Sequence, residues 1–324
     1  MHTHSIILSA TALMLASCSQ ATSPEAPDNA QTTLSAPATS QDISSTDLND
    51  STPLWKKMDC VREYGALPAA HRGGPRRGYP ENALETLQVS YDNGTRIFEI
   101  DIAESKDGVL FLMHDTDLDR TTEMTGVGRE KTWDQLKSVR LKDNNKVTNF
   151  TIPSLAETLK WAKETGAIVE LDKKRSSKFE TIISEVRKAG AQNNVILITY
   201  TYDQAAEVAR LAPDMMMTAS VSDPSDVEEL ESRGIKRQNL IAWTGTDTLN
   251  PGLWQDLKDM DIEVAFGTLG RRGQRFDDTF WEDRDGSEYD ELVNNGVTMI
   301  ATDYSDRVSN HLRVDDVAIE KCGF

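Results

Sequence analysis

Short apolar segments alternate with longer amphipathic segments along most of this chain, and this alternation limits the fold more than any other feature. It favours βα units that build a parallel sheet. Residues 154–165 carry apolar positions at helical spacing, and residues 178–190 form a second such segment that ends at Gly190. The apolar segments that we predict as strands are 66–72, 96–102, 109–114, 167–172, 194–200, 215–221, 239–244, 262–268 and 297–303.

The connection lengths identify one of these segments as an extra arm. Parallel neighbours need a crossover of about a dozen residues, but only "AESKDG" separates residue 102 from residue 109. That connection predicts a hairpin, with 109–114 as its return arm. The eight remaining strands predict an α/β fold of the TIM (β/α)8 barrel type over residues 54–324, with 109–150 as a small insertion after the second strand. An open doubly wound sheet is the alternative, but no GxGxxG motif opens a helix after any strand.

The first 18 residues have the features of a bacterial lipoprotein signal peptide. The apolar run "SIILSATALMLAS" is too short to span a bilayer, and it leads to Cys18 in a sequence similar to a lipobox, whose cysteine is lipidated. A cleaved signal without a lipid is the alternative, because "MHTH" contains no Lys or Arg. We therefore expect a bacterial cell-envelope protein, lipid-anchored to the membrane and periplasmic, or secreted.

Residues 19–53 contain 22 Ser, Thr, Ala or Pro among 35 positions. Such a segment buries too little apolar surface to offset its ordering entropy, which predicts a disordered linker. The net charge of −18 argues against a nucleic-acid partner, because phosphate backbones recruit basic surfaces. It leaves room for a small phosphorylated ligand held by a local basic cluster.

Chemically active side chains gather at the C-terminal ends of the predicted strands, where TIM barrels carry their sites. Glu99 and Asp101 are two residues apart in the apolar run "RIFEIDI" and so share one face. Paired carboxylates are costly to bury bare, and a hard divalent cation removes that cost. Asp172 or Glu170 on the next barrel strand would supply a third ligand. An oxygen-only set favours one Mg²⁺ or Ca²⁺ ion over zinc.

Histidines and cations complete this set. His71 and His114 end the first strand and the hairpin arm, and imidazoles serve as general acid and base near neutral pH. Arg72 and Lys174 supply positive charge, and arginine suits phosphate. Together with the carboxylates, these residues predict metal-assisted phosphoryl transfer.

Several blocks in fixed order closely resemble the glycerophosphodiester phosphodiesterases, a family of phospholipase C-like TIM-barrel phosphodiesterases. The blocks are "HRGG", "PENALET", "FEIDIAESKDGVLFLMHDTDLDRTT", "IPSLAETL", "IVELDKK" and "GVTMIATD", within residues 65–305. The resemblance implies a barrel that hydrolyses a small glycerophosphodiester to an alcohol and glycerol 3-phosphate with Ca²⁺ or Mg²⁺. His71 and His114 would match the acid/base pair, Arg72 the phosphate ligand, and Glu99 and Asp101 two metal ligands.

The sequence also departs from the family pattern. The third ligand is commonly Glu in a Glu-x-Lys pattern, and here only Asp172 with Lys174 preserves carboxylate-x-lysine, so we expect Asp172 rather than Glu170. Many members carry a tryptophan in the seventh strand, where Phe266 is the nearest aromatic residue of this chain. The alcohol part of the substrate is therefore left open. The alternatives are a phospholipase D-like or cyclising enzyme acting on intact lipid, and an inactive barrel that binds phosphorylated ligands.

Other features carry weaker expectations. Cys60 and Cys322 lie near the two ends of the folded body and either form a disulfide, as an oxidising compartment permits, or remain free thiols. We interpret Trp243 and Trp254 as packing residues and the basic loop 270–278 as solvated. The glycines after His71-Arg72 are expected to let the backbone approach a ligand, and Arg76 and Arg77 to form at most an anion-attracting rim.

Overall fold

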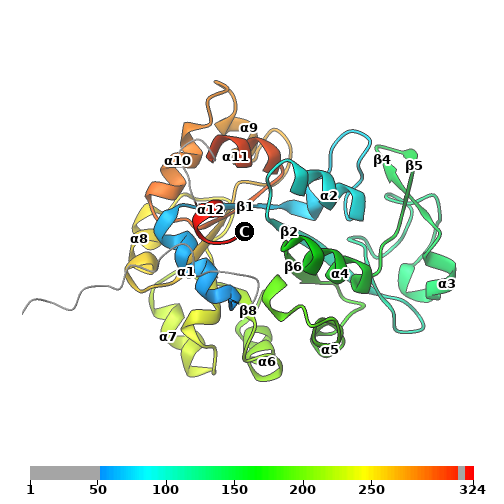
Figure 1. Ribbon diagram of the computed structural model, residues 1–324, viewed down its shortest axis with the longest axis horizontal. Helices are drawn as coiled ribbons and strands as arrows, with labels where there is room; N and C mark the ends of the chain where they lie inside the picture. Colours follow the sequence, from blue (N-terminus) through cyan, green and yellow to red (C-terminus); the bar gives the residue numbers. More distant parts are fainter. Residues whose placement is uncertain (1–51, 313–317) are drawn as a thin grey trace, which may run out of the picture. The chain divides into compact units, whose positions relative to one another are not determined.

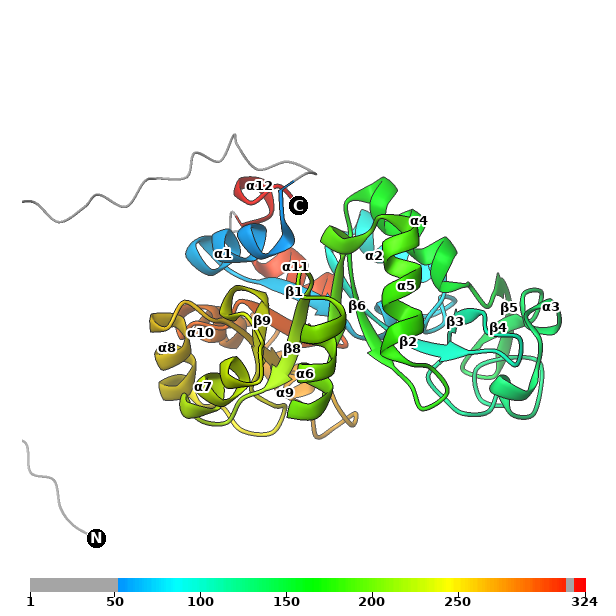
Figure 2. The ribbon, with the colours of Figure 1, turned by 90° about the horizontal axis from the view of Figure 1, so that it is seen from below.

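Eight parallel strands close into a barrel in the computed structural model, which describes residues 52–312 and 318–324 (Figures 1 and 2). The barrel strands are β1 (Leu67–Ala70), β2 (Ile97–Glu104), β6 (Ile168–Lys173), β7 (Val195–Ile198), β8 (Met216–Ser220), β9 (Leu240–Trp243), β10 (Glu263–Gly267) and β11 (Met299–Thr302). Pairing of β1 with both β2 and β11 closes the ring. The prediction of an eight-stranded barrel is therefore confirmed. The predicted signal peptide (1–18), and the predicted linker up to residue 51, lie outside the described residues.

Helices surround the strands. They are α1 (Leu54–Tyr64), α2 (Leu84–Asp92), α4 (Leu155–Thr165), α5 (Phe179–Ala189), α6 (Tyr202–Leu211), α7 (Ser225–Ser232), α8 (Pro251–Asp259), α9 (Phe276–Phe280), α10 (Ser287–Asn294), α11 (Ser305–Leu312) and α12 (Ala318–Lys321). Ser154 and Glu157 form a capping box at the start of α4, and Gly190 ends α5 with a φ of 63°. Among the described residues, no helix is both long enough and apolar enough to cross a membrane.

One apolar layer fills the barrel near the N-terminal ends of the strands. Each barrel strand contributes a side chain to it: Leu67, Ile97, Ile168, Ile196, Met216, Ile241, Ala265 and Met299. Leu54, Met58 and Val61 of α1 pack in the same cluster and cover this end of the barrel. Because successive side chains of a strand point to opposite faces, the residues two and four positions further along each strand also face the interior. This register places Glu99 and Asp101 beyond the apolar layer, toward the C-terminal ends of the strands.

A disulfide joins the two ends of the described chain. Cys60 of α1 is bonded to Cys322, just after α12, with the Cα atoms 5.6 Å apart. Lys57 also donates a hydrogen bond of 2.6 Å from Nζ to the carbonyl of Gly323. Both ribbon views place α12 and the C-terminus beside α1 (Figures 1 and 2). Of the two alternatives that the sequence left open, the structure contains the bonded pair.

The segment after β2 forms an elaboration at one side of the barrel (Figure 1). β3 (Leu110–Leu112) pairs antiparallel with β2, as the short connection predicts. The short helices η2 (Gly128–Glu130) and α3 (Trp133–Leu136) follow, and then the hairpin of β4 (Arg140–Asp143) and β5 (Lys146–Thr151). A small apolar core packs this elaboration against Ala83 and Ala103 of the barrel, and its other members are Phe111, Met113, Leu118, Leu136, Val139, Leu141 and Ile152.

Candidate active site

Three buried carboxylates form a cluster at the C-terminal ends of two neighbouring strands. Asp101 of β2 lies directly opposite Asp172 of β6 in the parallel pairing, and Glu99 precedes Asp101 on the same face. Each residue offers one oxygen atom, and these oxygens all lie within 4.8 Å of one another. Oδ1 of Asp172 is buried without a hydrogen-bond partner among the described residues. An unpaired buried oxygen in an all-carboxylate set fits one hard divalent cation.

The electrostatics of this cluster are those of crowded negative charge. Burial, and then the neighbouring Asp101 carboxylate, raise the pKa of Glu99 well above its ordinary value. Glu99 Oε2 accepts a hydrogen bond of 2.7 Å from the backbone N–H of Arg72. Lys174 Nζ lies 2.5 Å from Asp101 Oδ1 and 2.6 Å from Asp172 Oδ2. Burial acts against the charge on Lys174, but these two carboxylates outweigh it and raise its pKa.

Glu170 lies opposite Glu99 in the same strand pairing, one step deeper in the barrel than Asp172. It is 3% exposed, and burial followed by the charge of Asp172 raises its pKa to about 8. Among the described residues, the cluster that could hold a metal contains Asp172 and does not contain Glu170. The structure thus places Asp172, the residue expected from the carboxylate-x-lysine pattern, beside Glu99 and Asp101.

Asn82 orients Asp101, and the sequence reasoning assigned it no role. Its Nδ2 donates to Asp101 Oδ2 at 2.6 Å, and its Oδ1 accepts from the backbone N–H of Asp101 at 3.0 Å. Asn82 has a φ of 57°, in the left-handed region that asparagine tolerates better than most residues. The Pro-Glu-Asn block was the available signal, since an asparagine beside a predicted site can orient a carboxylate.

His71 follows β1 in the short helix η1 (His71–Gly73) and has a carboxylate partner. Its Nδ1 lies 2.8 Å from Oδ1 of Asp303, which follows β11. Burial acts against ionisation of Asp303, but His71 and the guanidinium of Arg275 outweigh it and lower its pKa. Arg275 belongs to the loop 270–278, so the expectation of a merely solvated loop is wrong for this residue. Its side chain is 10% exposed and pairs with Asp303 and Asp278.

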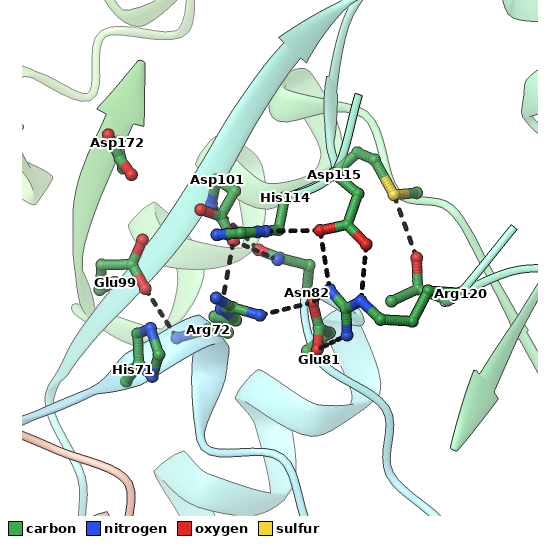
Figure 3. A network of polar contacts seen from close by, with 12 residues as sticks. His71, Arg72, Glu81, Asn82, Glu99, Asp101, His114, Asp115, Arg120 and Asp172 are labelled. Atoms are coloured by element: carbon green, nitrogen blue, oxygen red, sulfur yellow. Dashed lines mark hydrogen bonds and ion pairs between the residues drawn. The ribbon is translucent and has the colours of Figure 1, made fainter. Parts of the chain in front are cut away.

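His114 has an equivalent arrangement, visible in Figure 3. Its Nδ1 lies 2.7 Å from Oδ1 of Asp115. Arg120 donates from Nε to Asp115 Oδ2 at 2.6 Å and holds both oxygens of Glu81 at 2.7 and 2.8 Å. The hydrogen bond from Arg120 is the main cause that lowers the pKa of Asp115 to about 2. Each histidine therefore has Nδ1 engaged by a carboxylate, which leaves Nε2 for chemistry.

Arg72 lies between Glu81 and the carboxylate cluster. Its guanidinium donates to Glu81 Oε1 at 3.1 Å, and its Nε lies 3.9 Å from Asp101 Oδ2 (Figure 3). This Nε is buried with no hydrogen-bond acceptor among the described residues. The backbone of Arg72 has a φ of 51°, a costly conformation for a non-glycine residue that is often found at functional sites.

The neighbouring glycines and Arg76 have structural roles that differ from the expectations. A Cβ atom at Gly73 would lie 2.5 Å from a methyl group of Leu87 in α2, and one at Gly74 would lie 2.8 Å from the hydroxyl oxygens of Ser90 and Ser305. These glycines permit close packing of the turn against α2 and α11. Arg76 pairs with Asp306 of α11 and is no rim residue.

A cavity of about 270 Å³ contains the site. Both histidines, the carboxylate cluster, Glu170 and Lys174 line it, and an apolar wall is formed by Ile198, Tyr200, Trp243, Leu269 and Ala301. Trp243 packs against the apolar layer of the barrel, as interpreted, and it also lines this cavity. Trp254 is buried and packs on Phe266. Phe266 is fully buried and does not line this cavity, so the aromatic wall comes from Trp243 and Tyr200.

The barrel and its site define a TIM-barrel protein in which two histidines and a carboxylate cluster line one cavity. The sequence profile of the glycerophosphoryl diester phosphodiesterase family matches residues 71–254, which is more than half of the chain. This chain belongs to that family.

Individual relatives agree with this assignment. A crystal structure of a glycerophosphoryl diester phosphodiesterase from Parabacteroides distasonis has a TM-score of 0.70 and 26% identity, covering 81% of this chain and 92% of that one. An Oleispira antarctica phosphodiesterase shares the fold, with a TM-score of 0.61 and 20% identity over 78% of this chain and 99% of that one. The glycerophosphodiester phosphodiesterase of Caldanaerobacter subterraneus is 25% identical over 156 residues, 46% of this chain and 64% of the relative. For four curated relatives, the match covers 30% to 66% of the relative's length.

Proposed function

We propose that this protein hydrolyses glycerophosphodiesters to an alcohol and glycerol 3-phosphate, by general acid–base catalysis with a divalent cation, Mg²⁺ or Ca²⁺. The observation that carries the proposal is the shared cavity: two histidines, each with a carboxylate on Nδ1, line it together with a buried carboxylate cluster. Family membership supports the substrate class. The Oleispira antarctica phosphodiesterase of the same fold was crystallised with the product sn-glycerol-3-phosphate, which indicates the substrates to test first.

Glu99, Asp101 and Asp172 would hold the cation, which when bound would neutralise negative charge on the phosphate and polarise its oxygens. The chain's own residues perform the proton transfers. One histidine accepts a proton at Nε2 from the attacking group, which is a water molecule or the substrate's own glycerol hydroxyl. In the second case a cyclic phosphate forms, and water then opens it to give glycerol 3-phosphate. The other donates a proton from Nε2 to the leaving alcohol oxygen.

The charged residues around the histidines serve this reaction by fixing positions. Asp303 and Asp115 accept from Nδ1 and so hold the tautomer that leaves Nε2 toward the cavity. Arg72 does not itself line the cavity, but it lies beside Asp101, and we assign it to a phosphate oxygen because its buried Nε has no acceptor among the described residues. Lys174 balances the charge of Asp101 and Asp172.

The test is an assay of the purified protein on glycerophosphocholine and on intact phospholipid, with Mg²⁺, Ca²⁺ or EDTA. Release of glycerol 3-phosphate that depends on the metal is the expected result. A cyclic phosphate product from intact lipid would instead favour the phospholipase D-like alternative. Binding of glycerol 3-phosphate without turnover of any diester would instead favour the hypothesis of an inactive barrel that binds phosphorylated ligands.

For the location, we propose a lipid anchor at Cys18 and a place in the bacterial cell envelope, on the signal-like sequence of residues 1–18. The disulfide between Cys60 and Cys322 supports an oxidising compartment. Cys18→Ser should move the protein from the membrane fraction to the soluble fraction. A wild-type protein found only in the soluble cytoplasmic fraction would contradict the proposal.

A further inference from the structure

A second cavity adjoins the catalytic one. Its volume is about 480 Å³, and His114 and Lys174 line both cavities. The other residues that line it are Ala103, Phe111, Asp115, Thr116, Gly128, Arg129, Arg175 and Ser176. A group attached to a phosphate in the catalytic cavity can therefore continue past His114 into this space. Neither family membership nor the lining of the catalytic cavity says what the second cavity binds.

Two arginines at the second cavity have no ion-pair partner among the described residues. Arg129 lies in η2 of the insertion, and Arg175 follows β6, so two separate segments bring the guanidinium groups to one space. Both side chains are exposed, and neither forms an ion pair among the residues that the structure describes. This contrasts with Arg72, Arg120 and Arg275, which each contact a carboxylate. In a chain of net charge −18, two unpaired arginines at one cavity are a specific feature.

Asp115 lines this cavity and Glu104 adjoins one of its lining residues. Asp115 lines it, but Arg120 and His114 hold both of its oxygens. Glu104 lies next to Ser176, to which its backbone N–H donates, and its Oε2 accepts from the hydroxyl of Thr181 at 3.3 Å. The charge of Lys174 is balanced by the metal-site carboxylates. Arg129 and Arg175 are therefore the cations at this cavity that no carboxylate of the described residues contacts.

We infer that this second cavity receives the leaving alcohol of the substrate and prefers an alcohol that carries a second phosphate group. The inference rests on the proposed function, because it requires a phosphodiester in the catalytic cavity. Guanidinium groups form charge-assisted, bidentate hydrogen bonds to phosphate oxygens, and the hydroxyl groups of Thr116 and Ser176 suit a polyol. The same placement puts His114 nearest to the leaving oxygen, which assigns it the role of the proton donor.

The experiment compares the initial rates of two substrates: bis(glycerophospho)glycerol, whose leaving alcohol is glycerophosphoglycerol and so carries a second phosphate, and glycerophosphoglycerol, whose leaving alcohol is glycerol and carries none. The ratio of their kcat/KM values is measured for the wild type, Arg129→Gln, Arg175→Gln and the double variant. Each single variant should lower the ratio about tenfold, the size of one charge-assisted contact. Added salt should lower the wild-type ratio and change that of the double variant little.

Arg77→Gln is the matched control, since Arg77 is an exposed arginine that lines a different cavity. It removes the same charge and should leave the ratio unchanged. If the wild type hydrolyses both substrates and the double variant keeps the wild-type ratio, the inference is overturned and the proposed function stands. If the wild type hydrolyses no glycerophosphodiester with either metal, the proposed function fails and the inference fails with it.

Discussion

Gly267 of β10 leaves the space that the indole ring of Trp243 in β9 needs. A Cβ atom at Gly267 would lie 2.9 Å from Cη2 of Trp243, closer than such contacts occur in proteins. The seventh barrel strand thus lacks an aromatic residue of its own at the cavity, and the sixth strand supplies one. The aromatic wall of the catalytic cavity therefore depends on both Gly267 and Trp243.

Gly267→Ala should therefore displace the indole. The added methyl would also lie 2.7 Å from the Cγ2 methyl of Thr246, so both neighbours must move. We expect a loss of about 1–3 kcal/mol in the free energy of unfolding, as for other overpacked sites. We also expect a rise in KM of about tenfold from the displaced cavity wall. Urea denaturation and steady-state kinetics measure the two effects.

Gly252→Ala, in α8, is the control, because its Cβ would approach nothing closer than Asn250 Oδ1 at 3.9 Å. It should leave KM unchanged and, because alanine favours a helix over glycine, should not lower the free energy of unfolding. A Gly267→Ala protein with wild-type KM and an unchanged tryptophan emission spectrum would show that Trp243 does not shape the substrate site.

His71→Ala and His114→Ala should each lower kcat by about a hundredfold or more, the loss expected for a general acid or base. Asp303→Asn should lower kcat less and shift the pH profile, because Asp303 acts through the imidazole of His71 at 2.8 Å. His311→Ala is the control, since His311 pairs with Asp290 between α11 and α10 and does not line the catalytic cavity. Full activity of either His71→Ala or His114→Ala would contradict the proposed mechanism.

The barrel could be predicted because the sequence signals of its strands and helices lie within short stretches of the chain. Apolar runs at the strands, helix signals between them and the short link from β2 to β3 are all read within a few residues. The hairpin of β4 and β5 was missed because its strands are rich in polar residues and show no apolar alternation. Their position is fixed instead by the small apolar core of the insertion.

In the candidate site, too, the residues marked by local patterns were predicted and their distant partners were not. Strand-end positions and period-two spacing indicated His71, His114 and the carboxylates, and the structure brings these residues into one cavity. Their partners come from distant segments: Asp303 is 232 residues from His71 in sequence. Such pairs depend on which strand ends become neighbours, which a local pattern does not contain. That Trp243 also lines the cavity was not predicted, because this depends on the missing side chain of Gly267 on another strand.

Asp172→Asn should weaken binding of Mg²⁺ or Ca²⁺ about tenfold or more, because it removes a charged ligand from the cluster at Glu99 and Asp101. Glu170→Gln should change affinity much less, because Glu170 lies outside that cluster among the described residues. Isothermal titration calorimetry measures both without reference to turnover. Equal losses in the two variants would contradict the assignment of Asp172 as the third ligand.

Asp115 should stabilise the fold only when it is ionised. Its pKa is lowered from 3.8 to about 2, mainly by Arg120, so its contribution is fully present above about pH 4 and is lost as the pH falls toward 2. Asp115→Asn should therefore cost about 1 kcal/mol at pH 6, allowing for partial exposure, and less at pH 3. Urea unfolding at the two pH values measures the difference. Asp134→Asn, on the surface of the insertion, is the control, and a cost for Asp115→Asn that grows toward pH 3 would contradict the prediction.

The disulfide should protect the end of the barrel opposite the catalytic site. Cys60 and Cys322 are 262 residues apart, and their bond ties α12 to α1, which covers the apolar layer inside the barrel. Replacing both cysteines with serine should lower the free energy of unfolding by about 2–4 kcal/mol. Because the catalytic residues lie at the other end, kcat well below the melting temperature should stay near the wild-type value.

Thiol labelling tests the pairing itself. In a Cys18→Ser background, labelling of the folded, non-reduced protein should modify neither Cys60 nor Cys322. Reductant should destabilise that protein and leave the double-serine variant unchanged, and labelling of both cysteines before reduction would show that they do not pair.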